Sequence, residues 1–293
     1  MKIAIVALTR GYPKNKSDYS SLIKRNNSIY EHINKLRDIP ADMILFHEGN
    51  ISNEDQDYIN SFYPGKLIFK DVSKYFDIEN LNLGGEKKFN LGYRIMCRFN
   101  MYHIWEEVEN YDYILRVDED IELMDFDPLV FEKMYKNNIF YLTGRYTKDT
   151  HRLTNATLPY FLIDNTNLNV ERIYNHKNPY TNLYASSVTF WKNEEVNSLL
   201  KKIALSSEQI ENRWGDHTVQ GLLLNQFKIK IKLFKKLEYR HISHQLIIKN
   251  NFVRNLTVNS KLNPVSTTGN LYFRIKNRIK GKLYSSNKFD FDS

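Results

Sequence analysis

The amino-acid sequence predicts an α/β fold with a mostly parallel sheet flanked by helices. In the first half of the chain, apolar runs of strand length alternate with longer amphipathic segments, which is the pattern of βαβ units. Apolar residues make up 42% of the chain and charged residues 26%, with 20 Tyr and 17 Phe, a composition typical of globular proteins. Because 293 residues can bury a substantial core, we expect one large domain with a tail.

Four strands and two helices are predicted before residue 118. A helix at 20–36 follows from apolar side chains at helical spacing among Lys, Arg and Asn. A second helix, at 90–110, leads directly into the last of these strands. The predicted strands are 2–9, 42–48, 66–72 and 111–117.

The second half of the chain contains a similar mixture of elements. Asp127 followed by Pro128 predicts a helix start, because Asp is a favourable N-cap and Pro suits the first helical position. Lysines alternate with apolar residues at 228–234, which indicates a half-exposed strand whose charges discourage edge pairing. The other predicted elements are strands at 139–146 and 185–191 and helices at 194–205 and 216–226.

We expect the folded domain to span residues 1–245 and a basic extension to span residues 246–293. After about Leu246 the periodic pattern gives way to Asn, Lys, Ser and Thr. Two interpretations of the final LYFRIKNRIKGKLYSSNKF segment stay open. It forms either a basic amphipathic helix on an anionic membrane surface or a solvated helix packed by a few aromatic side chains, which is the commoner outcome.

Charge and cysteine content narrow the expected partners and compartment. The net charge of +8 favours anionic partners such as nucleotide sugars, phosphorylated glycans, anionic lipids or nucleic acids. The single Cys97 excludes an internal disulfide and favours a reducing compartment, and we interpret it as a buried apolar side chain. The apolar run at 3–8 is too short for a signal peptide, and no stretch approaches the roughly 20 apolar residues of a membrane span. We therefore expect a cytoplasmic protein that has the option of peripheral membrane contact.

Three consecutive carboxylates, Asp118, Glu119 and Asp120, follow the strand at 111–117. Like charges this close repel one another unless something positive lies on them. In an extended segment Asp118 and Asp120 point to one side, which places two oxygen ligands for one hard cation at the carboxyl end of a strand, where α/β sheets bind ligands. Mg²⁺ or Mn²⁺ fits better than zinc. The alternative is a solvated acidic turn with Arg116 paired to one carboxylate.

Four further patterns have both a functional and a structural interpretation. GYRIMCRFN at 92–100 places Tyr93, Arg94 and Arg98 on a helix that is otherwise an ordinary amphipathic one. Asp216 begins the helix in RWGDHTVQGLLL, where a plain N-cap is the simpler interpretation. His241 follows a strand in YRHISH, and a lone His is more often structural than a metal ligand. The segment TNLYASSVTFW at 181–191 is most simply core.

Together these segments resemble the fungal α-1,2-mannosyltransferase family (glycosyltransferase family 15), whose yeast members extend O- and N-linked mannose chains. The family motifs SYRHMCRFNSGFF, YRVEPDV, ERWGDAPVHS and GYFHPP are similar to GYRIMCRFN, LRVDEDI, NRWGDHTVQ and EYRHIS in this chain. All four occur in the family's order within residues 1–245. The matching segments are 92–100, 115–121, 212–220 and 238–243.

The resemblance implies a GT-A fold, a GDP-mannose donor, Mn²⁺ (or Mg²⁺), a glycan or glycolipid acceptor and retention of the anomeric configuration. It assigns Asp118, Asp120 and His241 to the metal and diphosphate end of the site. It assigns Asp216 and Tyr93 to catalysis near the donor or acceptor. Three arginines are implied as donor-binding or nearby cations that offset diphosphate charge, namely Arg10, Arg94 and Arg98.

The chain departs from the family pattern at two places. The family's Glu-Pro-Asp is Asp118-Glu119-Asp120 here, which keeps oxygen ligands but removes the proline. The family segment FWSNFEIGDLSFW aligns with 180–191 so that its Glu, the usual candidate nucleophile, falls on Tyr184. Tyr184 thus occupies a catalytic position without a carboxylate. We therefore expect front-face substitution, which needs no such carboxylate.

Other functions remain as alternatives. The chain could be a GT-A transferase for another nucleotide sugar, or a non-catalytic relative that binds nucleotide sugars or glycans. A nucleotidyltransferase is less favoured, because residues 9–20 contain only one Gly where such enzymes need a Gly-rich loop. Nucleic-acid binding ranks last, since it explains the basic charge but not the acidic cluster.

Overall fold

A seven-stranded sheet is the centre of the structure, a computed structural model that describes residues 1–12, 14–77, 90–165, 176–250 and 252–256. Its strands are β1 (Ile3–Thr9), β2 (Asp42–His47), β3 (Leu67–Asp71), β4 (Tyr113–Val117), β6 (Tyr141–Thr143), β9 (Leu183–Ser187) and β10 (Lys232–Leu233). They lie in the order β10-β6-β9-β4-β1-β2-β3. All neighbours run parallel except β9, which is antiparallel to both β4 and β6. The predicted mostly parallel sheet is therefore confirmed.

Two smaller sheets complete the β structure of the described residues. The four-stranded sheet has the order β13-β12-β11-β5 and begins immediately after the acidic segment. Its strands are β5 (Ile121–Phe126), β11 (Leu237–His241), β12 (Leu246–Lys249) and β13 (Phe252–Asn255). In the antiparallel register of β5 and β11, Ile121 lies opposite His241. Strands β7 (Tyr146–Thr147) and β8 (Asn178–Pro179) form a short ladder.

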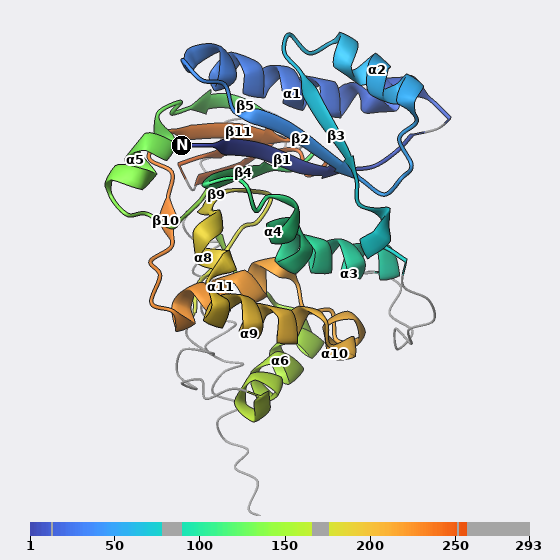
Figure 1. Cartoon of the computed structure of the whole chain (residues 1–293). Helices are drawn as coiled ribbons and strands as arrows, with labels where there is room; N and C mark the ends of the chain where they lie inside the picture. The colour runs from blue at the N-terminus through green and yellow to red at the C-terminus, as the bar shows by residue number, and fades with distance from the viewer. Residues whose placement is uncertain (13, 78–89, 166–175, 251, 257–293) are drawn as a thin grey trace, which may run out of the picture. The chain divides into compact units, whose positions relative to one another are not determined.

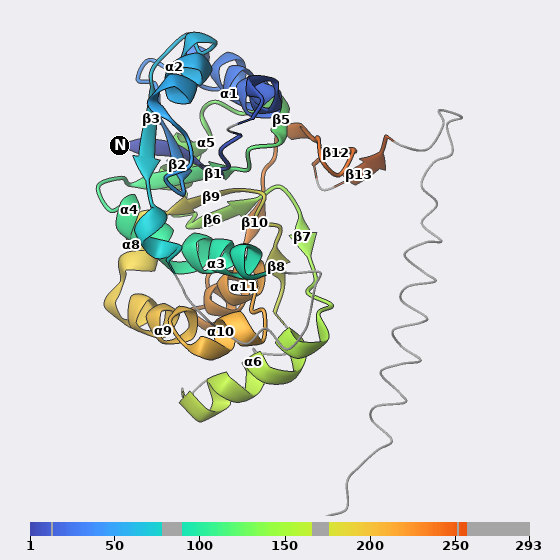
Figure 2. The same cartoon turned by 90° about the vertical axis from the view of Figure 1, so that its right-hand side faces the viewer.

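Helices cover both faces of the main sheet (Figures 1 and 2). On one face lie α1 (Ser20–His32) and α2 (Asn53–Ser61), and on the other a larger group of long and short helices. These are α3 (Leu91–Arg98), α4 (Ile104–Glu107), α6 (Arg152–Asn165), α8 (Val188–Lys192), α9 (Glu194–Ala204), α10 (Ser207–Glu211) and α11 (Asp216–Gln226). Helix α5 (Val130–Lys136) follows β5.

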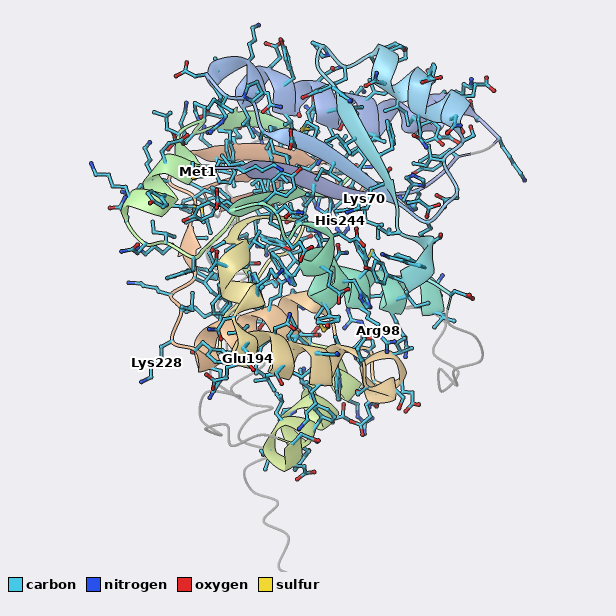
Figure 3. The ribbon with its side chains drawn as sticks, in the orientation of Figure 1. Met1, Lys70, Arg98, Glu194, Lys228 and His244 are labelled. Atoms are coloured by element: carbon cyan, nitrogen blue, oxygen red, sulfur yellow. The ribbon has the colours of Figure 1, made fainter. Side chains whose placement is uncertain are left out.

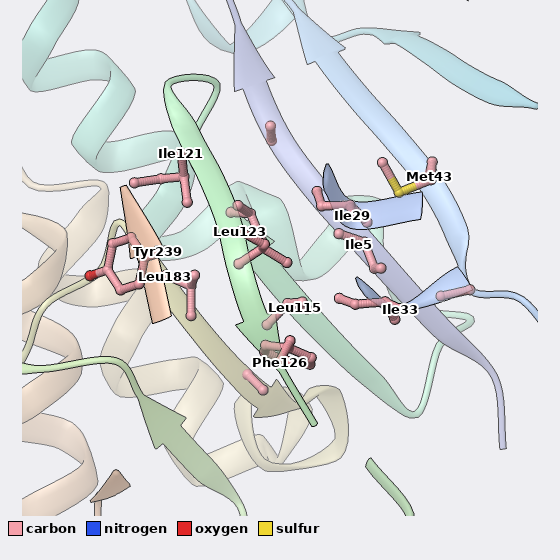
Figure 4. Packing of buried hydrophobic residues seen from close by; sticks show 14 of the residues in the cluster. Ile5, Ile29, Ile33, Met43, Leu115, Ile121, Leu123, Phe126, Leu183 and Tyr239 are labelled. Carbon is pink, nitrogen blue, oxygen red and sulfur yellow. The ribbon is translucent and has the colours of Figure 1, made fainter. Parts of the chain in front are cut away.

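The hydrophobic core has two parts because the sheet is buried on both faces. In β1, Ile3, Ile5 and Ala7 belong to one cluster of buried residues, and Ala4 and Val6 belong to the other. This alternation explains the continuous apolar run of the strand, which is typical of parallel sheets covered by helices. Figure 4 shows the first cluster, in which side chains of the sheet meet those of α1 and β5.

The predicted helix at 90–110 is confirmed, but it is not regular throughout. Asn90 caps α3 by accepting a hydrogen bond from the backbone of Tyr93. Residues Phe99–His103 form a π-helical turn between α3 and α4. Such turns widen a helix locally and frequently occur near functional sites.

The predicted strand at 185–191 is wrong after Ser187, because the chain continues as α8. The ring of Trp191 stacks on Trp105 at 4.9 Å, and its indole nitrogen donates to Ser186 at 2.8 Å. Tertiary packing of this large side chain outweighs the strand propensity of the segment.

The predicted strand at 228–234 is confirmed only for Lys232–Leu233. Lys228 lies in the turn after α11, with a φ of 58°, so pairing with β6 begins late. The predicted strand at 139–146 is likewise divided into β6 and β7 by residues that leave the ladder.

The compact unit of the structure extends from Met1 to Val253. It runs beyond the boundary expected at residue 245, because β12 pairs with β11 in the smaller sheet. Most of the expected basic extension, residues 257–293, lies outside the described residues. No helix among the described residues has the length and apolar character needed to cross a membrane.

Candidate active site

The acidic segment forms the tight turn between β4 and β5. The Asp118 amide donates a hydrogen bond to the carbonyl of Asn182, at 2.9 Å, and the Asp118 carbonyl accepts one from the Ile121 amide at 3.2 Å. The turn lies at the carboxyl end of β4, beside the carboxyl end of β1. It therefore occupies the position in an α/β sheet where ligands bind.

Glu119 points away from its two neighbours and fastens the turn to the end of β1. Its carboxylate accepts from the Thr9 hydroxyl at 3.0 Å, from the Arg10 amide at 3.0 Å and from the Arg10 guanidinium at 2.7 and 2.6 Å. The side chain of Arg10 is 70% exposed, so this ion pair is open to solvent on one side. The expected role of Arg10 in donor binding remains a prediction, and in this structure Glu119 is its partner.

Asp118 is paired with Arg116. Its Oδ1 accepts from the Arg116 Nε at 3.0 Å and from Nη2 at 2.8 Å. Burial raises the pKa of Asp118 to about 6, against the opposing effect of Arg116, and the nearby Asp120 and Asp216 add to the rise. The ion pair that the solvated-turn alternative expected is therefore present, with a buried Arg116 and an Asp118 side chain that is 31% exposed.

Asp120 meets His241 at the start of the smaller sheet. The Asp120 Oδ2 lies 3.3 Å from the His241 Nε2, and the Ile242 amide donates to the Asp120 carbonyl at 2.9 Å. Burial acts to raise the pKa of Asp120, but hydrogen bonds from His241 and Ser243 outweigh it and lower the pKa to about 2. Asp120 is thus a carboxylate at every physiological pH.

The second nitrogen of His241 faces a polar environment. Its Nδ1 lies 3.4 Å from both the Tyr180 hydroxyl and the Asn182 amide nitrogen. The ring also stacks on His244 at 4.2 Å, and His241 is only 5% exposed. These contacts fix the ring orientation, as the outer partners of metal-binding histidines do.

Asp120 and His241 fit as two ligands of a divalent cation. Neighbouring ligands of an octahedral Mg²⁺ or Mn²⁺ stand roughly 3 Å apart, close to the observed 3.3 Å. No group of three His, Cys, Asp or Glu side chains within the described ranges is arranged to hold a metal. The structure therefore brings together two of the three expected ligands, while Asp118 is held by Arg116. Two protein ligands suit a cation whose other positions are filled by diphosphate oxygens and water.

Asp216 is the second acidic group of the site and begins α11. Its Oδ2 accepts from the Arg116 Nη1 at 2.7 Å, and the residue is 5% exposed. The simpler interpretation as an N-cap is wrong, because Gly215 is the cap residue of α11. A carboxylate in the first turn is also favoured by the helix dipole.

Tyr93, the other catalytic candidate implied by the resemblance, lies near enough to Asp216 for the carboxylate charge to act on its hydroxyl. Its hydroxyl accepts from the Arg213 Nη2 at 3.4 Å. The thiol of Cys97, burial and Asp216 all raise the pKa of Tyr93, so its hydroxyl is protonated at neutral pH. It can therefore act as a hydrogen-bond donor.

Arg94 and Arg98 face α10 rather than the acidic turn. Arg94 is fully buried and donates to the carbonyls of Ile210 at 2.6 Å and Glu211 at 2.8 Å. Arg98, labelled in Figure 3, donates to the Gln209 side chain and to the Ser206 carbonyl, each at 3.0 Å. The Arg94 contacts lie at the C-terminus of α10, where carbonyls attract cations, and the Ser206 carbonyl lies at its N-terminal end. Both arginines were expected to offset the charge of a bound diphosphate. Their contacts with α10 do not favour that role.

Tyr184 lies beneath the site. In the register of β4 and β9 it is opposite Arg116, and its ring stacks on Tyr141 at 5.1 Å. The residue is 0% exposed, and burial raises the pKa of its hydroxyl to about 12. A side chain that is both covered and protonated has neither the access nor the charge of a nucleophile. Its candidacy as a reacting group is therefore not supported by its environment.

Sequence reasoning missed one contact of Arg116 and missed Asp149 entirely. Arg116 was expected to pair with one carboxylate, but it also binds Asp216, which is 100 residues away in the chain. Asp149 accepts from Arg213 at 3.3 Å and from Thr218 at 2.8 Å, and so holds the start of α11 in place. Asp149 lies in a loop without a recognisable motif, so no local signal could have identified it.

Comparisons with known proteins agree with the motif resemblance. No protein-family model matches the chain. An O-glycoside α-1,2-mannosyltransferase homologue of Schizosaccharomyces pombe is 25% identical over 181 residues, which is 53% of this chain and 47% of the relative. The match thus spans about half the length of that curated protein. The predicted resemblance to the fungal α-1,2-mannosyltransferases is confirmed.

Solved structures show the fold. Core-mannan synthase A (CmsA/Ktr4) from Aspergillus fumigatus, in a Mn/GDP form, gives a TM-score of 0.67 at 18% identity, covering 83% of this chain and 75% of that one. Ktr4p from S. cerevisiae in complex with GDP gives 0.66 at 18% identity, covering 90% and 77%. Mouse xyloside xylosyltransferase 1 gives 0.53 at 12% identity, covering 80% and 85%. The expected GT-A fold is confirmed.

Proposed function

We propose that this chain is a metal-dependent glycosyltransferase that moves mannose from GDP-mannose to a glycan hydroxyl with retention of configuration. One observation carries the proposal: the turn 118–120 places a carboxylate against His241 at the ligand-binding end of a GT-A sheet. The similar fold of CmsA/Ktr4 in its Mn/GDP form supports the choice of cation and nucleotide.

Asp120 and His241 would hold the cation, which is Mn²⁺ or Mg²⁺. When bound, such an ion neutralises the negative charge that grows on a departing nucleotide diphosphate. Asp120 supplies a full charge at neutral pH because its pKa is about 2. His241 supplies a ring nitrogen whose direction is fixed by Asn182, Tyr180 and His244.

Asp216 and Tyr93 are proposed to act on the sugar and the acceptor. Asp216 can accept a hydrogen bond from the acceptor hydroxyl and orient it, and it can remove the proton as the new glycosidic bond forms. Tyr93 can donate to a phosphate or sugar oxygen, because its hydroxyl stays protonated. Their proximity on α3 and α11 brings a donor and an acceptor of hydrogen bonds together.

Retention is proposed to follow from front-face substitution. In that route the acceptor attacks from the side on which the diphosphate leaves, and no enzyme nucleophile is needed. The position aligned with the family's candidate nucleophile is the covered Tyr184, which supports this route over a covalent one. Trapping a glycosyl adduct on Tyr184 by mass spectrometry would contradict it.

Thermal unfolding with a panel of nucleotide sugars tests the donor. We expect GDP-mannose, in the presence of Mn²⁺, to raise the unfolding temperature more than UDP-glucose, UDP-xylose or GDP-glucose does. Chelation of the ion should remove the shift, because binding that favours the folded state raises its stability by mass action. Absence of a response to every nucleotide would contradict the proposed function, and a response to UDP-sugars alone would move it to another GT-A donor.

A second candidate is a nucleotide-sugar-binding protein without turnover. The observation that favours it is again Tyr184, since a carboxylate is missing where the family has one. Binding of Mn²⁺ and GDP-mannose together with no hydrolysis or transfer to any mannose-containing acceptor would identify this function. Membrane contact by the basic extension is a further proposal, supported by composition alone.

A further inference from the structure

We propose that Arg116 is a positioning residue that couples the cation end of the site to Asp216. The proposal rests on the proposed function, because it assigns the two carboxylates that Arg116 binds to the cation side and to the acceptor side of one site. It goes further in stating that these two sides are not independent.

The geometry of Arg116 is that of a bridge. Its Nη2 and Nε bind Asp118 at 2.8 and 3.0 Å, and its Nη1 binds Asp216 at 2.7 Å. The three nitrogens of one planar guanidinium are thus divided between two carboxylates. These come from segments that lie far apart in the chain. Because the fork is rigid, a change in the position of one carboxylate changes the geometry offered to the other.

Within the described parts of the chain, Arg116 has no carboxylate partner other than Asp118 and Asp216. The residue is 5% exposed, and Tyr184 lies opposite it in the register of β4 and β9. Tyr184 occupies the position at which the aligned family has a Glu, so a third carboxylate is replaced by a neutral ring. Among the described residues, the Arg116 guanidinium is therefore shared by Asp118 and Asp216 alone. Water does not screen so buried a charge, which makes the sharing effective.

The second oxygen of Asp118 has no protein hydrogen-bond partner among the described residues, so it is available to a bound cation or its water. The negative charge on Asp118 that such a ligand meets depends on how fully Arg116 neutralises it. Asp216 binds the same guanidinium, so Arg116 neutralises the negative charge of Asp118 less completely. Removing the charge of Asp216 should then weaken cation binding at the other end of the network.

A double-mutant cycle on Mn²⁺ binding tests this coupling. The variants are Asp216→Asn, Arg116→Lys and their combination, and the readout is Mn²⁺ affinity in the presence of GDP, followed by electron paramagnetic resonance of free Mn²⁺. A lysine keeps the charge but its single ammonium cannot hold both carboxylates in the same geometry. We expect Asp216→Asn to weaken Mn²⁺ binding by about threefold or more in the native background and to have almost no effect beside Arg116→Lys.

Equal effects of Asp216→Asn in both backgrounds would overturn the proposal. Arg37→Lys is the matched control, since Arg37 binds the carboxylate of Glu132 and the carbonyl of Pro128 far from the acidic turn. It should leave Mn²⁺ affinity unchanged, which separates coupling from general loss of a buried arginine. If the native protein bound neither Mn²⁺ with GDP nor any nucleotide sugar, the proposed function would fail, and this proposal with it. Native binding with an additive cycle would refute the coupling alone.

Discussion

At the scale of single residues, the acidic turn shows how a changed sequence keeps a rigid geometry. The aligned family has Pro between its two acidic residues, and this chain has Glu119. Glu119 binds Thr9 and Arg10 at the end of β1, so hydrogen bonds now restrain the turn that a proline ring would restrain through its fixed φ. Asp118 and Asp120 keep their orientation toward the site as a result.

Residue-scale sequence reasoning predicted an acidic group beside a cation-binding position but not the partners of each side chain. Glu119 does have other partners than Asp118 and Asp120, but the segment is a tight turn and not the extended strand on which the prediction rested. The partnership of Arg116 with Asp216 could not be predicted, because it depends on where α11 begins relative to β4 in three dimensions. The burial of Tyr184 likewise depends on Tyr141 in a neighbouring strand.

Cys97 provides a pH-dependent prediction. Burial raises the pKa of its thiol to about 12, so the folded protein holds this proton more tightly than the unfolded chain does. Its contribution to stability is therefore complete below the ordinary thiol pKa of about 8.5 and is lost as pH rises above that value. We expect Ellman's reagent to leave Cys97 unmodified in the native protein from pH 7 to pH 9 and to modify it quickly in urea. Rapid reaction of the native protein at pH 8 would show that the thiol is accessible.

At the scale of elements, α10 connects the helix of the MCRF motif to the start of α11. Arg94 and Arg98 reach from α3 to the carbonyls at either end of α10. The Gln209 side chain donates in turn to the Trp214 carbonyl at 3.0 Å. The MCRF motif on α3 and the RWGD motif before α11 are therefore connected through α10. These contacts help to fix the position of Asp216 at the start of α11.

Removing Arg94 should loosen this connection. We expect Arg94→Ala to lower the free energy of unfolding by about 3 kcal/mol, because buried carbonyls lose a charged donor. Urea denaturation followed by tryptophan fluorescence measures the change. Arg240→Ala is a suitable comparison, since the Arg240 and Glu122 side chains are 44% and 32% exposed and an exposed pair contributes about 0.5 kcal/mol or less. Equal losses in the two variants would argue against the structural importance of the α10 contacts.

Element types were predictable where local periodicity and tertiary packing agree. The strands of the first half and the helix that becomes α3 and α4 fall in this class. Prediction failed at α8, where the packing of Trp191 against Trp105 outweighs the local preference for a strand. It also failed to find the π-helical turn at Phe99–His103, which leaves no simple mark on hydrophobic spacing.

At the scale of the whole molecule, the net charge of +8 coexists with a local concentration of acidic groups. Among the contacts of the described residues, Asp118 and Asp216 share the buried guanidinium of Arg116, and Asp120 lies against the ring of His241, so these three carboxylates outnumber the one arginine that binds them. A cation fits such a site, and an anionic donor fits the basic protein around it. The fold itself was predictable from the alternation of strand and helix patterns and from the four motifs in the family's order, which the structure places on α3, the turn between β4 and β5, α11 and β11.

Release of GDP from GDP-mannose is the most direct measure of the central claim. The native chain and Asp120→Asn should be compared at saturating Mn²⁺, with a mannose-containing acceptor, after circular dichroism has shown that both are folded. Because Asp120 would supply one of the two protein ligands proposed from the described residues, we expect a loss on the order of 100-fold in the variant, and loss of the Mn²⁺ dependence expected of the native protein. Equal Mn²⁺-dependent release by both proteins would contradict the assignment of the acidic turn as the cation site.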